Sequence, residues 1–86
     1  MVSLESYRYS SGFGGLDSEA WRARLWREVA MVGGYDLEFA ETAEGVEAVF
    51  TVPARDGPDA FAIGEKVMRA VSPRGLWLGA SRAAAL

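Results

Sequence analysis

Acidic side chains are the residues of this 86-residue chain whose spacing could most directly serve chemistry. Paired carboxylates can bind a metal ion or act as general acid and base. Asp36 and Glu38 alternate with apolar residues, so they share one face of a predicted strand, about 7 Å apart. We favour another interpretation, a charged edge strand that resists edge-to-edge aggregation, with an acidic partner-binding patch as the alternative. Residues 35–52 carry five acids and no basic residue: Asp36, Glu38, Glu41, Glu44 and Glu47.

The composition removes most catalytic groups. The chain has no Cys and no His, which excludes disulfides, thiolate chemistry and any catalytic triad or zinc site that requires these residues. A Gly-rich segment at residues 12–15 precedes a predicted helix, but it lacks the Lys-Ser/Thr of a phosphate-binding loop, and we interpret it as a connection. We therefore predict no catalytic residue, no metal site and no cofactor, and we favour a non-enzymatic protein over an enzyme.

Charge and hydropathy bear on nucleic acids and membranes. The net charge is −3 and the sequence pI is near 4.8, whereas proteins that bind nucleic acids usually carry a basic stripe. The first residues contain no apolar signal region, and no apolar segment is long enough to span a bilayer. We expect a cytoplasmic protein that binds neither nucleic acid nor membrane.

The first half of the chain predicts a strand followed by a helix. Residues 2–10 alternate in the manner of a strand. Asp17 or Ser18 can cap a helix whose apolar stripe lies at helical spacing and which ends at Gly33-Gly34. The stripe consists of Trp21, Leu25, Val29 and Val32.

The second half predicts a hairpin, a helix and a strand. Tyr35, Leu37 and Phe39 alternate with acids, and residues 35–41 and 46–52 form an antiparallel pair. A helix begins near Asp56-Gly57-Pro58, and Gly64 lets it approach the sheet closely. Residues 76–78 form a short last strand. The apolar face of the helix consists of Ala60, Phe61, Gly64, Val67, Met68 and Val71.

This order of elements is strand, helix, strand, strand, helix, strand. At this length it favours the ferredoxin-like βαββαβ arrangement, an α+β fold in which two helices cover one face of a four-stranded antiparallel sheet. Right-handed crossovers give the strand order 4-1-3-2. We expect one domain at residues 1–80, followed by an Ala-rich tail at residues 81–86.

Aromatic residues beyond those needed for the core indicate a possible interface. With Phe39 and Phe50 facing the helices, the opposite face of the sheet would hold Val49, Trp77, Tyr7 and Tyr9. On the first helix, a Trp lies about 100° from the middle of the apolar stripe and could either pack at the core margin under an Arg or anchor a partner. The predicted interface residues are Tyr7, Tyr9, Val49, Trp77 and Trp26.

An open sheet face with aromatic side chains could stack nucleic-acid bases, hold a small molecule or pair with another subunit. The third strand carries acids where an RNA-recognition strand carries basic and stacking groups. We therefore expect a non-catalytic module that forms a homo-oligomer or docks on another protein through its sheet face. The alternatives are a regulatory module that binds a small ligand, and a small dimeric α+β enzyme with a cleft at the subunit interface.

Overall fold

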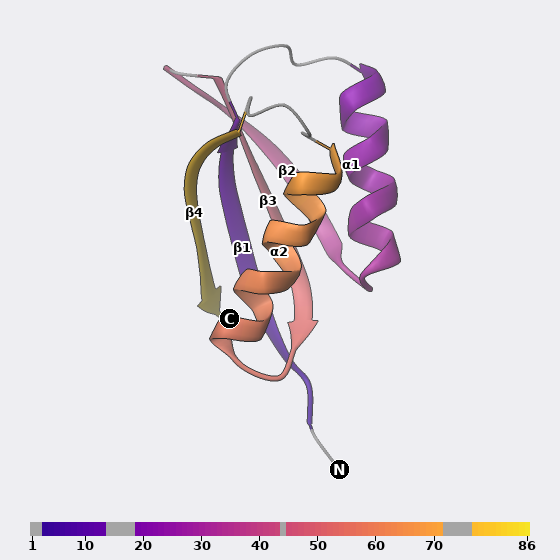
Figure 1. Ribbon diagram of the computed structural model, residues 1–86, viewed down its shortest axis with the longest axis vertical. Coiled ribbons are helices and arrows are strands. Elements are labelled where there is room, and N and C mark those ends of the chain that lie inside the picture. Colours follow the sequence, from indigo (N-terminus) through magenta and orange to yellow (C-terminus); the bar gives the residue numbers. More distant parts are fainter. Residues whose placement is uncertain (1–2, 14–18, 44, 72–76) are drawn as a thin grey trace.

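A computed structural model describes residues 3–13, 19–43, 45–71 and 77–86. The elements follow the predicted β-α-β-β-α-β order (Figure 1). They are β1 (Glu5–Phe13), α1 (Glu19–Met31), β2 (Tyr35–Thr42), β3 (Gly45–Ala54), α2 (Gly57–Val71) and β4 (Trp77–Ala85).

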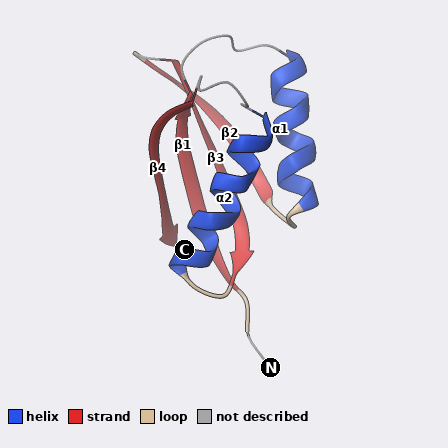
Figure 2. Ribbon diagram, in the orientation of Figure 1, coloured by secondary structure: helices blue, strands red, loops and turns tan. Residues whose placement is uncertain are grey.

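The strands form one antiparallel sheet in the order β2-β3-β1-β4. Figure 2 shows both helices on the same side of this sheet, so no helix of the described residues lies on its other face. The predicted ferredoxin-like arrangement, strand order and β2–β3 hairpin are confirmed. Because β1 and β3 are the central strands, their side chains form most of both faces.

The core lies between the sheet and the two helices. Its largest fully buried side chains come from every layer: Tyr9, Phe50 and Val52 from the sheet, Leu25 and Val29 from α1, and Val67 and Met68 from α2. The apolar stripe predicted for α1 is buried at Trp21, Leu25 and Val29, with Val32 packed at its margin. Burial of these side chains supplies the main favourable free energy of folding.

Helix α2 lies very close to β1 at Gly64. A Cβ atom at this position would overlap the aromatic ring of Tyr9, so the predicted role of Gly64 is confirmed. The predicted burial of Phe61 is wrong in part. Its side chain stays 39% exposed, and its ring meets Tyr9 edge-on with the centroids 6.2 Å apart. The close approach at Gly64 leaves room for a large ring only at the side of α2.

The ends of the helices follow local chemistry. The Asp59 N–H donates to Asp56 Oδ1 at 2.8 Å, and the Arg55 N–H donates to Asp59 Oδ2 at 3.1 Å, which together cap the start of α2. After α1, Gly33 has φ +76° and the Gly34 N–H donates to the Val29 carbonyl at 2.8 Å. Gly adopts this left-handed conformation at low cost. The predicted cap at residues 17–18 lies outside the described residues.

Two strands are longer than predicted. β1 continues through Gly12 to Phe13, into the segment that we interpreted as a loop, and β4 extends to Ala85. The predicted Ala-rich tail is therefore wrong, because most of it belongs to the sheet. β4 pairs with β1 as far as Tyr7↔Ala85. The hydrogen bonds between β1 and β4 join backbone groups. A run of Ala, which has weak strand propensity, can therefore form a strand because β1 pairs with it.

Candidate interaction surface on the open face of the sheet

The face of the sheet that carries no helix, called the open face here, takes every second residue of each strand. In β1 it takes Ser6, Arg8 and Ser10, whereas Tyr7 and Tyr9 point to the helices and belong to the core. The prediction that both tyrosines lie on the open face is therefore wrong. Residues paired directly across a ladder share a face, and Tyr9 pairs with Phe50, a core residue.

A bulge in β2 moves Tyr35 onto the open face. Tyr35 pairs with Thr51 and Glu38 pairs with Val49, so two residues of β2 occupy the interval of one residue on β3. Asp36 supplies the extra residue in a left-handed conformation with φ +54°. Bulges of this kind re-aim side chains. The alternation of residues 35–39 predicts that Tyr35 and Leu37 lie on the same face. The bulge instead places Tyr35 on the open face and Leu37 in the core.

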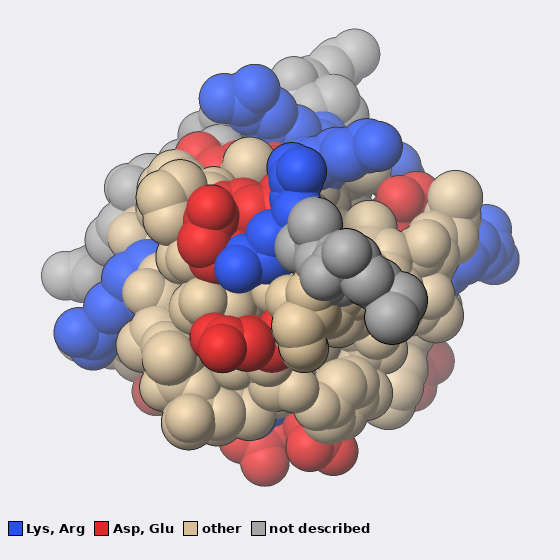
Figure 3. All heavy atoms as spheres, turned by 90° about the horizontal axis from the view of Figure 1, so that it is seen from below, with Lys and Arg blue, Asp and Glu red and all other residues tan. Residues whose placement is uncertain are grey.

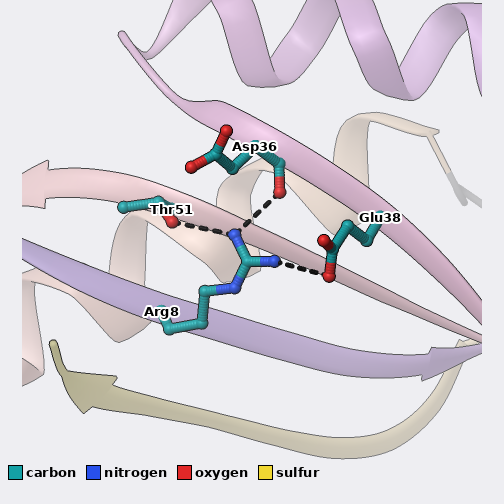
Figure 4. Close-up of polar contacts among 4 residues, drawn as sticks. All are labelled: Arg8, Asp36, Glu38 and Thr51. Carbon is teal, nitrogen blue, oxygen red and sulfur yellow. Dashed lines mark hydrogen bonds and ion pairs between the residues drawn. The ribbon is translucent and has the colours of Figure 1, made fainter.

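Arg8 bridges three strands on the open face (Figure 4). Its Nη1 donates to Asp36 O at 2.7 Å and to Thr51 Oγ1 at 2.8 Å, and its Nη2 donates to Glu38 Oε2 at 3.0 Å. The Asp36 carboxylate points away from the guanidinium, and its carbonyl is the acceptor. Because its own chain supplies these acceptors, the guanidinium of Arg8 is held in one position.

Tyr35 is also held by its own chain. Its hydroxyl lies 3.1 Å from Ser6 Oγ, within hydrogen-bond distance, and 45% of its surface remains exposed. Thr51, the residue opposite both Tyr35 and Arg8 in the ladders, is buried even though it belongs to the open face. Arg8 and Tyr35 therefore have defined positions around the buried Thr51.

The charge on this face is less one-sided than the sequence predicts. β2 is an edge strand, as expected, but Arg8 from β1 provides Glu38 with a basic partner across β3. The side chain of Glu38 is 73% exposed, so the ion pair is close to solvent and adds little net stability. At the end of the molecule seen in Figure 3, acidic and basic side chains are interspersed.

The remaining predicted interface residues lie in different places. Val49 is half-buried on the open face, opposite Glu38. Trp26 is 55% exposed on α1, in the helix layer, and the guanidinium of Arg22 lies over the Phe39 ring at 4.4 Å. The two alternatives for Trp26, packing under an Arg and anchoring a partner, both stay predictions. The backbone of Trp77 pairs with Phe13, and its side chain lies outside the described part.

Sequence reasoning missed Arg8, Tyr35 and Thr51. The signal for Arg8 was present, because Ser6, Arg8 and Ser10 alternate with two tyrosines, and the polar set marks the solvent face of a strand. Nothing comparable marks Tyr35, because its position depends on the bulge.

The helix side of the sheet also holds a polar contact. The Tyr9 hydroxyl donates to Glu65 Oε2 at 2.8 Å. Burial, and then the neighbouring Glu65 carboxylate, raise the pKa of Tyr9 to about 12, although the nearby serine hydroxyls act in the opposite direction. The hydroxyl therefore stays protonated at neutral pH and serves as a fixed donor that ties α2 to β1.

Within residues 3–13, 19–43, 45–71 and 77–86, no three Asp or Glu side chains gather into a group that could hold a metal ion. Neither of the described helices is long and apolar enough to cross a membrane.

No protein family, no curated protein and no solved structure matches this chain.

Proposed function

We propose that this protein is a non-catalytic docking module that binds another protein through the open face of its sheet. The observation that carries the proposal is the pair Arg8 and Tyr35, both held by hydrogen bonds from their own chain on a face that no helix covers. Together with Trp, Arg and Tyr are the residue types that most often dominate the binding energy of protein interfaces.

Preorganisation supports this proposal. When binding immobilises a mobile Arg, the loss of rotamer freedom costs about 0.5–1.5 kcal/mol of binding free energy per side chain. Arg8 and Tyr35 are already restricted in the free protein. Val49 adds apolar surface beside the Arg8–Glu38 pair. An apolar residue among ordered polar groups is typical of interfaces that form and separate.

The composition points the same way. The chain offers neither His nor Cys as a nucleophile, base or metal ligand. Among the residues that the structure describes, the one buried hydroxyl with a strongly raised pKa is that of Tyr9, which lies in the core and not on the open face.

Site-specific photocrosslinking tests the proposal. A photoreactive amino acid at position 49 places the reactive group on the open face, and the same amino acid at exposed Lys66 of α2 is the matched control. In the cells that make the protein, we expect position 49, and not position 66, to yield a crosslink to one defined protein.

The captured protein is then purified and its affinity measured by titration calorimetry. We expect Arg8→Ala to weaken binding about tenfold or more, in line with loss of an interface anchor. Arg27→Ala on α1 changes one exposed basic side chain in the helix layer and should leave the affinity unchanged. Equal losses from both variants, or no crosslink at position 49, would contradict the proposal. A crosslink to a second copy of this chain would assign the face to self-association instead.

A further inference from the structure

The sheet has two edge strands, β2 and β4, and they differ in how they resist pairing with another chain. An edge strand presents unpaired N–H and C=O groups, which natural proteins guard with charges or bulges. β2 has both guards, because it carries Asp36, Glu38 and Glu41 and bulges at Asp36. β4 has one charged residue, Arg82, and no Pro. Its register against β1 shifts between Trp77 and Ser81, so only residues 81–85 pair with β1 in an unbroken register.

The register shows which groups of β4 are available. The Leu86 N–H donates to the Ser6 carbonyl at 3.2 Å, and the ladder continues in the same phase through Arg8↔Ala84 and Ser10↔Arg82. Hydrogen bonding alternates along an antiparallel strand. The N–H and C=O groups of Ser81, Ala83 and Ala85 therefore point away from β1, toward the free edge.

We propose that β4 pairs antiparallel with β4 of a second copy of this chain, about a twofold axis perpendicular to the sheet. A strand can join this ladder only if it offers a free edge of its own. Of the two edges in the described part of the chain, β2 is guarded, so β4 is the matching strand on a second copy. A contact between identical segments closes at two copies and does not grow into a fibre.

Charge selects the register. Centred on Ala83, the pairing places Ala83 opposite the partner's Ala83, Ser81 opposite the partner's Ala85, and Arg82 opposite the partner's Ala84. A register centred on Arg82 would place two guanidinium groups directly opposite each other, which is unfavourable. In the first register the outward backbone groups of residues 81, 83 and 85 all find partners.

The pairing keeps both helix layers on one side and both open faces on the other. It joins two four-stranded sheets into one continuous sheet and brings two open faces together. The inference goes beyond the proposed docking function, because the edge pairing stands or falls whatever the open face binds.

Sedimentation equilibrium of the whole chain tests the edge pairing, and we expect a dimer. Ala85→Pro removes an N–H that points away from β1, so the chain's own sheet keeps its hydrogen bonds, and the dissociation constant should rise about tenfold or more. Ala84→Lys should weaken the dimer by placing a second charge opposite the partner's Arg82, whereas Ala84→Glu should strengthen it. Ala62→Lys on α2 is the matched control, because it adds the same charge at an exposed Ala that belongs to no strand.

A mixed sample of labelled and unlabelled chains gives a direct readout. We expect an intermolecular NOE between the α protons of Arg82 and the partner's Ala84, which face each other closely in this register. A chain that stays monomeric at high micromolar concentration would overturn the proposal. So would a dimer that responds equally to Ala84→Lys and Ala62→Lys, or open-ended assemblies, which would indicate β4 pairing with β2. None of these results bears on the crosslink from position 49.

Discussion

Arg8 and Tyr9 are neighbours in β1, yet each represents a different face of the sheet. Both donate a hydrogen bond to a Glu of another element, Arg8 to Glu38 at 3.0 Å and Tyr9 to Glu65 at 2.8 Å. Tyr9 is fully buried, whereas the side chain of Arg8 is 25% exposed. The same kind of hydrogen bond therefore lies in the core on one face and close to solvent on the other.

On the helix side, the contact belongs to a close-packed interior. The ring of Tyr9 touches Phe50, Phe61 and the backbone of α2 at Gly64, so it cannot move without disturbing the core. On the open face, Arg8 and Glu38 are screened by water, and their contact orients a surface while adding little stability. Substitutions on the two faces should accordingly differ in size, and the predictions below test that difference.

Gly64→Ala should have the largest effect on stability. The new methyl group overlaps the Tyr9 ring, and overpacking of this kind costs about 1–3 kcal/mol. We expect a loss of about 2–3 kcal/mol in the free energy of unfolding, measured by urea denaturation. Gly57→Ala is the control, because a Cβ there meets nothing within 4 Å. Equal effects of the two substitutions would show that α2 does not lie close to β1.

Tyr9→Phe should have a smaller effect, which depends on pH. At neutral pH, loss of the hydrogen bond to Glu65 should cost about 1 kcal/mol. The pKa of Tyr9 is raised from 10.0 to about 12, so the hydroxyl is protonated in both folded and unfolded chains below pH 10. Between pH 10 and 12 the unfolded chain loses this proton first, so the stability of the wild type falls. The Tyr9→Phe variant should lack this part of the fall.

Titration of the phenolate absorbance provides a direct measurement for Tyr9. We expect one tyrosine to ionise near pH 12 in the folded wild type and that step to disappear in Tyr9→Phe. Burial also raises the pKa of Tyr7, but its hydroxyl contacts Glu5 and not Glu65, so in the control Tyr7→Phe the step near pH 12 should remain. A wild type in which every tyrosine ionises near pH 10 would contradict the burial of Tyr9.

The fold could be predicted from the sequence because its signals are periodic. The apolar stripe of α1, the alternation in β3 and the turn residues between them agree with one another, and four antiparallel strands with two helices follow from their order. The alternation in β1 was equally regular, yet it predicted the wrong face for Tyr7 and Tyr9. Period 2 divides a strand into two sets of residues without saying which set faces the helices.

The candidate site could not be predicted because it depends on contacts across strands. Arg8 reaches Glu38 over β3, and these two residues are 30 positions apart in the chain. β4 shows the same limit, since residues 81–85 become a strand only because β1 lies beside them. In both places tertiary pairing overrides local propensity.

Substitutions at Asp36 test the open face and should have the smallest effect when the bulge is kept. Asp36 has φ +54° and uses its carbonyl, not its carboxylate, to accept from Arg8. Asp36→Gly retains the carbonyl and adopts this conformation freely, so we expect stability to change by no more than about 0.5 kcal/mol. Asp36→Val keeps the carbonyl but disfavours positive φ, at about 1–2 kcal/mol. It should also weaken the NOE between the Tyr35 ring and Ser6, because Tyr35 reaches the open face only through the bulge. If the Val variant kept both that NOE and wild-type stability in urea, the bulge would not be what places Tyr35 beside Arg8.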